Sequence, residues 1–296
     1  MAAKSNSMKL RQITIVGLGL IGGSIGSAVR KYLPDVRVIG VSRDQKRIEL
    51  AKKKGIIHTG TRELRAGLIG TDLVLICTPV DTILKLVLEI DRLLKTSAVV
   101  TDVGSTKDQL TKGVNRSKLK HVEFIGSHPF AGSHHTGLTY SDADLFLKAQ
   151  VMVTQSRHTT TRANETVVSF WKKLGGKVIV LSSKKHDQIA SQISHLPHVV
   201  AASLVCAVSK KFLCYGATGF RDTTRIAQSD PKLWRPILMS NRERLIQDLI
   251  HLQSIISNFI SNLKKDSGTG VEKLLRQAFL KCCQLALQKH SKVPRK

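Results

Sequence analysis

The sequence predicts an α/β domain with a largely parallel sheet, followed by an all-α helical domain. Two observations predict this order. Up to Leu181 the chain alternates short apolar runs with helical stretches, which is typical of parallel strands and the helices that cover them. From Asp187 onward the apolar residues recur about every 3.6 positions, which is typical of helices alone. We therefore predict two domains, residues 1–183 and 184–296.

The predicted strands of the first domain are short apolar runs bounded by glycine or polar residues. They cover residues 13–17, 36–42, 73–77, 98–103, 122–127, 150–154 and 177–181. Helical stretches at 22–31, 45–54 and 82–94 separate the early runs. Such helices cover the faces of a parallel sheet, whose carboxyl edge then carries the ligand.

The second domain is predicted to begin with a long amphipathic helix. Asp187 is a suitable N-cap for this helix, and Pro197 is expected to bend it because proline has no backbone N–H. Helical patterns also cover 231–263 and 271–288, with a loop at 265–270 between them. We expect these helices to form a homodimer interface or to be buried within one subunit.

Composition and charge argue against several classes of protein. The formal net charge is +26, but basic residues are spread along the chain and only 4% of residues are aromatic, so no specific nucleic-acid surface is indicated. A basic surface that attracts small anions fits this distribution. The sequence contains no run of roughly 18 or more apolar residues, so we predict no membrane-spanning helix. Five cysteines without a CxxC pair are typical of reduced thiols in a cytoplasmic protein.

A glycine-rich turn follows the first apolar run, with the sequence Gly-Leu-Gly-Leu-Ile-Gly. In this pattern the first glycine permits a tight turn, the second lets the backbone approach a pyrophosphate, and the third lets the next helix pack closely. The amides at the helix N-terminus then face the anion. The pattern predicts a Rossmann-type dinucleotide-binding domain, and a glycine turn without a ligand is the alternative. The predicted contacts are Gly17, Gly19, Leu20, Ile21 and Gly22.

The end of the second predicted strand indicates which dinucleotide is bound. An acidic residue there would bind the ribose hydroxyls of NAD, whereas a small residue beside an arginine accommodates the 2′-phosphate of NADP. The chain has Ser42 and Arg43 at this position, so we predict a preference for NADP. If Asp44 is the ribose ligand instead, the cofactor is NAD.

Polar residues also follow the later predicted strands. Thr78 follows the third run, Asp102 and Ser105 follow the fourth, and His128 follows the fifth. Since the carboxyl ends of parallel strands meet at one edge, these residues are expected beside the nicotinamide. A histidine there can take a proton from a hydroxyl while hydride leaves the carbon, and Ser105 could share that hydroxyl. A strand-end histidine bonded only to backbone is the plainer interpretation of His128.

Three histidines of the predicted helical domain raise the question of a metal site. His195 and His198 lie one helical turn apart, and His186 precedes them. A zinc site requires three or four convergent ligands, and no nearby carboxylate or cysteine pattern completes this one. We therefore predict no metal.

Together these segments resemble the prephenate/arogenate dehydrogenases of tyrosine biosynthesis. The resemblance runs from about residue 13 to 245 in the family's order and spacing, and it covers the glycine turn, 78–79, 102–107, 128–132, Gly137, 186–187, 194–198 and 219–231. It implies a dinucleotide domain followed by a helical dimerisation domain. It also implies oxidative decarboxylation of a 4-hydroxycyclohexadiene, with hydride transfer to nicotinamide and loss of carbon dioxide.

The resemblance further implies residue roles. His128 would be the base on the ring hydroxyl, and Ser105 would position that hydroxyl and the nicotinamide. Arg225 would bind a substrate carboxylate through its guanidinium, although ion pairs of the arginines with Asp222 or Asp230 are the plainer interpretation. Thr78 and Asp102 would contact the cofactor. Further predicted substrate contacts are His198, His186, Trp234, Ser133 and Arg221.

The choice between two substrates rests on residues 133–136, which read Ser-His-His-Thr and contain no carboxylate. An acidic residue there would pair with the side-chain ammonium of arogenate. We therefore favour prephenate, although the NADP-like strand end favours arogenate, and an enzyme that accepts both is a further interpretation. We expect residues 1–11 to be a short polar leader, with no chorismate mutase segment before the first strand.

Two other functions are weighed against this one. A reductase or 3-hydroxyacid dehydrogenase of related two-domain build would use different residues in the helical half. A nucleic-acid-binding protein with a degenerate dinucleotide fold is suggested only by the net charge. We expect a small anionic substrate and neither a specific nucleic acid nor a membrane as a partner.

Overall fold

The computed structural model describes residues 8–132, 137–157 and 159–290. Its contacts divide the chain into two compact units, residues 1–244 and 245–296. The first unit holds the sheet, its covering helices and the shorter helices that follow them. The predicted domain boundary at 183 is a different division of the chain, and it falls where the last strand ends and the next helix begins.

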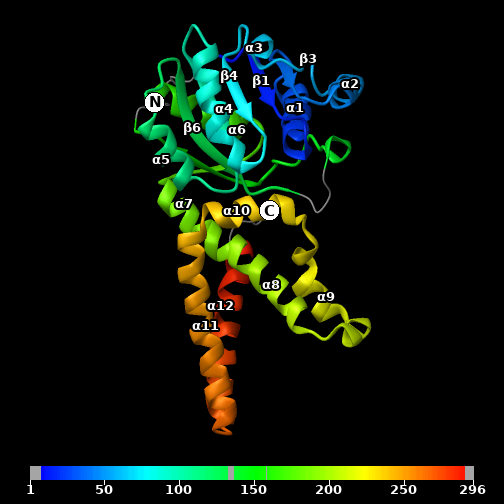
Figure 1. Cartoon of the computed structure of the whole chain (residues 1–296), viewed down its shortest axis with the longest axis vertical. Helices are drawn as coiled ribbons and strands as arrows, with labels where there is room; N and C mark the ends of the chain where they lie inside the picture. The colour runs from blue at the N-terminus through cyan, green and yellow to red at the C-terminus, as the bar shows by residue number, and fades with distance from the viewer. Residues whose placement is uncertain (1–7, 133–136, 158, 291–296) are drawn as a thin grey trace. The chain divides into compact units, whose positions relative to one another are not determined.

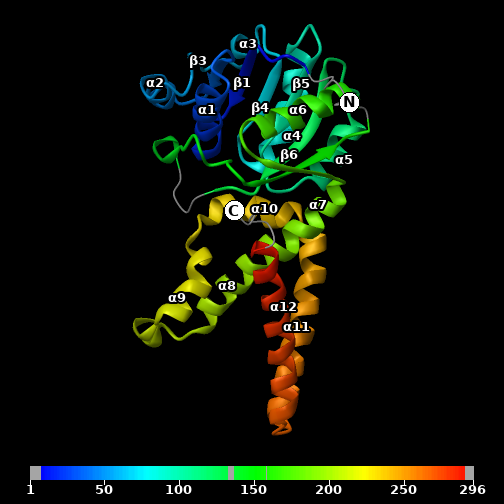
Figure 2. The ribbon, with the colours of Figure 1, turned by 180° about the vertical axis from the view of Figure 1, so that it is seen from behind.

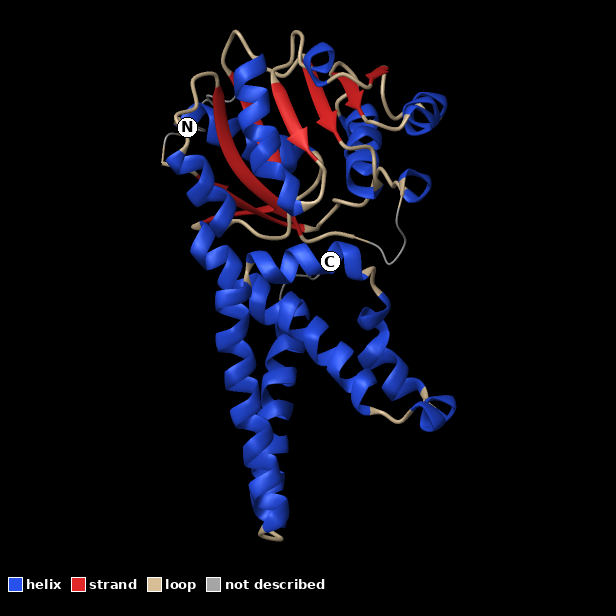
Figure 3. Cartoon of the chain, viewed as in Figure 1, coloured by secondary structure: helices blue, strands red, loops and turns tan. Residues whose placement is uncertain are grey.

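An eight-stranded sheet forms the centre of the first unit, in the order β3-β2-β1-β4-β5-β6-β7-β8 (Figures 1 and 3). All neighbouring strands are parallel except β6 and β7, which are antiparallel. The strands are β1 Gln12–Val16, β2 Arg37–Val41, β3 Thr59–Thr61, β4 Leu73–Ile76, β5 Ala98–Asp102, β6 Val122–Pro129, β7 Gln150–Gln155 and β8 Lys177–Leu181. The predicted α/β fold class is thus confirmed.

Two differences from the predicted strands have simple causes. The short strand β3 was not predicted, because Thr59-Gly60-Thr61 contains no apolar run and lies largely exposed at the sheet edge. Strand β6 extends two residues beyond its predicted end, to Pro129, because its last residues pair with β7. His128 therefore lies within the strand, opposite Met152.

Helices cover both faces of the sheet and form two apolar cores (Figures 1 and 2). On one face pack α1 Leu20–Tyr32, α2 Gln45–Lys53 and α6 Thr161–Lys173, whose buried apolar side chains, Trp171 of α6 among them, belong to one core. On the other face pack α3 Leu64–Gly67, α4 Val80–Leu93 and α5 Asp108–Arg116. Strands buried on both faces are expected to be continuously apolar, as β4 is.

The register of the central strands gathers the predicted site loops. Val16 of β1 lies opposite Ile76 of β4, and Ile76 lies opposite Asp102 of β5. The residues after these strands therefore leave the sheet side by side at its carboxyl edge. In an open α/β sheet, this edge is where ligands bind.

The helical half of the first unit begins with a helix whose first turn differs from the prediction. It consists of α7 Ser183–Ala190, a widened π turn η2 Ser191–His195, and α8 Leu196–Ala207. Its N-cap is Ser182, whose hydroxyl accepts from Lys185 N, so the predicted N-cap Asp187 is wrong. The π turn lies directly before Pro197, which has no N–H to continue the regular ladder.

Further short helices complete this half of the unit. They are η3 Lys210–Tyr215, α9 Thr218–Thr224, η4 Arg225–Gln228 and α10 Pro231–Ser240. The continuous helix Ser183–Ala207 is long and apolar enough to span a membrane by length and composition alone, which the sequence had not indicated. Its first turns, however, are hydrogen-bonded to the α/β part through Asp187. We therefore interpret it as a helix of a folded domain.

The second unit consists of a helical hairpin. Helix α11 Arg242–Lys264 runs into it from the first unit, and α12 Gly268–His290 follows after a short turn. The turn contains Asp266 with a positive φ of 53°. The loop between α11 and α12 is shorter than the predicted 265–270, because α12 begins at Gly268 rather than near Val271.

Candidate active site

A cavity of about 1040 Å³ lies at the carboxyl edge of the sheet, entirely within the first unit. Its walls come from the glycine turn, from the ends of β4, β5 and β6, and from the helical segments α8, η4 and α10. Among the predicted site residues, it brings together Gly19, Leu20, Ile21, Thr78, Ser105, His128, His198, Arg225 and Trp234. Cys77, Gln228 and Ser229 also line it and were not predicted.

The glycine turn has the geometry that a pyrophosphate requires. Gly17 has a positive φ of 101°, and a Cβ at this position would lie 2.6 Å from the carbonyl oxygen of Cys77. A Cβ at Gly22 would overlap the carbonyl oxygen of Gly17, so the helix can pack closely only without a side chain there. At Gly19 a Cβ would meet no atom within 4 Å, because this residue faces the open cavity. These residues fit a dinucleotide.

The residues that follow β2, on which the NADP prediction rests, do not line the cavity. Asp44 caps α2, accepting from Lys46 N and Arg47 N, and pairs with the Arg47 guanidinium at 3.3 Å. Its carboxylate is therefore already engaged. Ser42 directly follows the strand, and Arg43 is exposed beside it.

A fully buried ion pair shapes the loop that carries Ser105. Lys107 Nζ lies 2.7 Å from Asp102 Oδ2 and also donates to the carbonyl oxygen of Gly104. Asp102 in turn accepts from Gly104 N. This network folds the loop back on itself and places Ser105 at the cavity surface. Burying a charged pair is favourable only when hydrogen bonds complete it, as they do here.

The same network corrects the role predicted for Asp102. Its side chain is fully buried and does not line the cavity, because Lys107, Gly104 N and Ser127 N surround it. A direct contact with a cofactor is therefore not available to this carboxylate. It holds the loop in place instead.

A hydrogen-bonded chain links His128 to the second half of the unit. His128 Nδ1 lies 2.9 Å from His186 Nε2, and His186 Nδ1 lies 2.7 Å from Asp187 Oδ1. An ionised carboxylate only accepts, so the proton of His186 is on Nδ1 and its Nε2 accepts from His128. The lone pair of His128 is then on Nε2, the nitrogen outside this chain.

His186 was predicted to contact the substrate. It does not line the cavity, and it bonds instead to His128, which does. Its side chain is fully buried. Asp187 has two functions at once, because its carboxylate also accepts from Lys107 N and Asp108 N, at 2.8 and 2.9 Å. It thereby caps α5, a helix of the other half of the unit. The first turns of α7 are thus fixed to the α/β part.

The surroundings of the histidine pair favour neutral rings. Burial lowers the pKa of His128 well below its ordinary value of 6.5. Repulsion from His186, Lys107 and His195 lowers it further. Burial also lowers the pKa of His186, although its bond to Asp187 opposes this effect. A neutral His128 at pH 7 can accept a proton.

The helical wall of the cavity is built from an aromatic pair and an arginine. The rings of His198 and Trp234 are stacked, with centroids 3.3 Å apart and 27° between their planes. Burial lowers the pKa of His198 to about 4. Arg225 is exposed at the start of η4, and within the described ranges it makes no ion pair with Asp222 or Asp230.

One predicted substrate contact, Arg221, lies outside the cavity, and another cannot be placed. Arg221 is exposed, lies outside the cavity, and donates from Nε to the carbonyl oxygen of Gly216. Local backbone bonding of this kind cannot be seen in a sequence pattern. Ser133 lies outside the described residues, as does the rest of segment 133–136 on which the substrate preference was based.

The residues that support the site have almost no signal in the sequence. Asn241 donates to the carbonyl oxygen of Asp187 and lies 3.2 Å from His195 Nδ1, so it supports both. Lys107 looked like one of many lysines, although it is fully buried. Only its place five residues after a strand-end aspartate could have indicated an ion pair.

Comparison with known proteins identifies the family. The nucleotide-binding domain model of prephenate dehydrogenase matches residues 25–180, and the dimerization domain model of the same family matches residues 182–277. The chain belongs to the prephenate dehydrogenase family. It is accordingly an oxidoreductase of the prephenate and arogenate dehydrogenase class, which confirms the resemblance noted above.

Individual relatives agree with this assignment. A prephenate dehydrogenase of Bacillus subtilis is 35% identical over 81% of this chain and 67% of its own length. A prephenate dehydrogenase of Aquifex aeolicus, solved with hydroxyphenyl propionate and NAD+, is 28% identical with a TM-score of 0.87 over 94% of this chain and 99% of its own. A Synechocystis arogenate dehydrogenase is 29% identical with a TM-score of 0.80 over 93% of this chain and 99% of its own.

Proposed function

We propose that the chain catalyses the oxidative decarboxylation of prephenate with a nicotinamide dinucleotide as hydride acceptor. The observation that carries this proposal is one cavity lined by His128 and Ser105 from the α/β part and by Arg225 from the helical part. A base and a carboxylate-binding cation in one cavity suit a small ring that carries a hydroxyl and carboxylates. The family of the chain supports the same reaction.

His128 is the proposed base. Its neutral ring accepts the proton of the ring hydroxyl at Nε2, while the bond to His186 keeps the opposite nitrogen protonated. Hydride leaves the ring carbon that carries this hydroxyl, and the ring carboxylate then departs as carbon dioxide. The proton can return from His128 to the phenolate oxygen, so the atoms and charges balance. Aromatisation of the ring supplies much of the driving force.

Ser105 and Arg225 are proposed to orient the substrate. The Ser105 hydroxyl can share the ring hydroxyl with His128, because the buried Lys107–Asp102 pair holds its loop in place. The Arg225 guanidinium can bind a carboxylate bidentately. His198 and Trp234 offer a stacked aromatic surface between these two ends. Orientation of this kind lowers the barrier by holding the reacting groups in place.

The cofactor supplies the hydride acceptor when it is bound. Gly17, Gly19 and Gly22 would hold its pyrophosphate, with Leu20 and Ile21 at the start of α1. Thr78 lines the cavity at the end of β4. We propose that NADP is preferred over NAD, since Asp44 is engaged as a helix cap and Ser42 and Arg43 are the remaining polar groups at the end of β2.

Arogenate is the alternative substrate, and two observations favour it. The Synechocystis relative is named an arogenate dehydrogenase, and the end of β2 has the NADP-like sequence noted above. We further propose a cytoplasmic homodimer formed through the helical domain of residues 184–296, because the family model that matches 182–277 is named a dimerization domain.

The test is absorbance at 340 nm with prephenate and arogenate, each with NAD and NADP. We expect turnover with prephenate and NADP, and a loss of about 10²–10⁴-fold in kcat for His128→Asn, the usual contribution of a general base. Circular dichroism and thermal unfolding of the variant verify that it is folded. If no pair gives turnover above that variant, the proposed reaction is wrong.

A further inference from the structure

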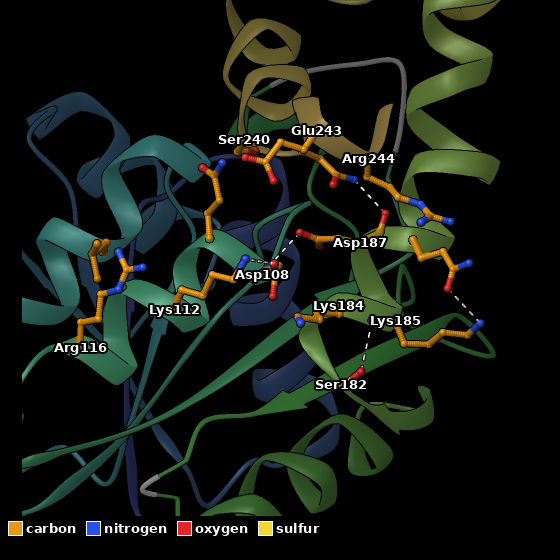
Figure 4. Close-up of a pocket in the computed structure, with 15 residues that line it drawn as sticks. Asp108, Lys112, Arg116, Ser182, Lys184, Lys185, Asp187, Ser240, Glu243 and Arg244 are labelled. Atoms are coloured by element: carbon orange, nitrogen blue, oxygen red, sulfur yellow. Dashed lines mark hydrogen bonds and ion pairs between the residues drawn. The ribbon is translucent and has the colours of Figure 1, made fainter. Parts of the chain in front are cut away.

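A second cavity of about 970 Å³ lies in the same compact unit (Figure 4). It is lined by α5, by the first turns of α7, and by the junction of α10 and α11. It shares none of its lining residues with the cavity of the proposed active site. A volume of this size is in the usual range for small-molecule sites.

Basic side chains from three elements line this cavity. They are Lys112, Arg116, Lys184, Lys185 and Arg244, against three acidic residues. Figure 4 shows that these side chains come from both sides of the cavity rather than from one helix. An anion with two or more charged groups could therefore contact several of them at once.

Two of the three acidic side chains of the cavity, Asp108 and Asp187, have partners of their own. Asp108 pairs with Lys112 at 2.7 Å and accepts from the Ser183 hydroxyl. The Asp187 carboxylate accepts from Lys107 N, Asp108 N and His186. The ion pair of Asp108 therefore also engages Lys112, one of the five basic side chains. Lys184 and Lys185 of α7 are exposed.

Asp187 joins this cavity to the proposed active site. Its side chain is 6% exposed and lines the cavity, while the same carboxylate holds His186, which holds His128. An occupant of the cavity would thus lie beside the last member of the chain that orients the proposed base. The groups that also face these rings are Lys107, Asp102 and His195.

We propose that this second cavity binds a small polyvalent anion, a di- or tricarboxylate or a phosphate, and that occupancy acts on the proposed active site through Asp187. The binding part stands by itself, and the coupling part rests on the proposed function. The high positive charge of the chain favours the arrival of such anions but does not by itself create a site.

The test of binding compares citrate and inorganic phosphate with sodium chloride at equal ionic strength. We expect citrate and phosphate to bind saturably to the full chain in titration calorimetry. Both anions should also raise its Tm. In Lys184→Glu/Lys185→Glu the affinity should fall about tenfold or more. Glutamates are favourable in a first helical turn, so this variant is expected to fold.

The matched control is Lys172→Glu/Lys173→Glu in the last turn of α6. It changes the net charge by the same amount at two exposed lysines outside the cavity. We expect it to bind citrate and phosphate as the wild type does. An equal response of all three proteins would show that the anions act only on the overall charge, and the proposed site would be wrong.

Coupling is tested by the pH dependence of kcat/KM with and without saturating citrate. An anion near Asp187 stabilises the protonated histidines, so the acidic limb should move to higher pH by a few tenths of a unit. The shift should vanish in Lys184→Glu/Lys185→Glu and persist in the control. Saturable binding without any shift in the wild type would overturn the coupling but leave the proposed reaction intact.

Discussion

The two walls of the active-site cavity are built in different ways. On the α/β side, His128 and the Ser105 loop are fixed by buried hydrogen bonds and a buried ion pair. On the helical side, Arg225 is exposed and forms no ion pair with its acidic neighbours among the described residues. The difference indicates that the groups proposed for chemistry are oriented before substrate arrives, whereas the group proposed for binding gains its partner only with substrate.

The largest expected effect concerns the α/β side of the cavity, where His128 is held by His186 and Asp187. Asp187→Asn should lower kcat by about 10²-fold, because the charged acceptor that sets the protonation of both rings becomes a neutral amide, which accepts from His186 more weakly. The variant should also lose about 1–3 kcal/mol in the free energy of unfolding, since two backbone amides lose a charged acceptor. Steady-state kinetics and urea denaturation measure the two losses separately.

The matched control for this variant is Asp91→Asn. Asp91 is a buried carboxylate that accepts from three backbone amides, Lys120 N, His121 N and Val122 N, and bonds to no imidazole ring in the described structure. We expect a similar loss of stability with an unchanged kcat. If Asp187→Asn loses stability alone, the comparison between the two walls fails, because the histidine chain would then have no part in orienting the base.

The next largest effect concerns the exposed wall. Arg225→Ala should raise KM about 10–100-fold while changing kcat much less, which is the pattern of lost ground-state binding. Arg221→Ala is the control, because this guanidinium lies outside the cavity and, within the described part of the chain, donates to the carbonyl oxygen of Gly216. A fall of kcat as large as the rise of KM would show that Arg225 acts in the transition state, like the fixed wall.

A smaller effect is expected at the cofactor end. Arg43→Ala should raise KM for NADP about tenfold and leave KM for NAD nearly unchanged, since only NADP carries the 2′-phosphate. Arg65→Ala in α3 is a suitable control for removal of one exposed arginine. An unchanged ratio of the two KM values would contradict the proposed preference.

The smallest expected effect is that of His195 on the pH dependence of the free energy of unfolding. Burial lowers the pKa of His195 in the folded protein to about 4, from an ordinary value of 6.5. Between these values the unfolded chain binds a proton here and the folded chain does not, so this residue lowers the free energy of unfolding as pH falls from 6.5 to about 4. His195→Gln should make that decline shallower in urea denaturation. An identical decline in both proteins would show that His195 is not held neutral.

Local sequence patterns were sufficient for much of the fold and for the positions of the main site segments. Runs such as 73–77 and 98–103 predicted strands, and their polar ends predicted which residues meet at the sheet edge. The same patterns failed at Asp187 and Asp102, where the side chain bonds to residues remote in the chain or buried in the same loop. His128 and His186 are 58 residues apart, and Lys107 and Asp187 are 80 apart.

By itself the sequence determined the alternation of strands and helices, the glycine turn and the family, because hydrophobic periodicity and glycine conformation act over a few residues. The tertiary structure decided which polar groups face the cavity and which are buried behind it. It showed that His186 stands behind His128, that Asp187 caps α5, and that Lys107 lies in the core. Such pairings follow from burial, since a polar group removed from water must find a partner wherever the fold brings one near.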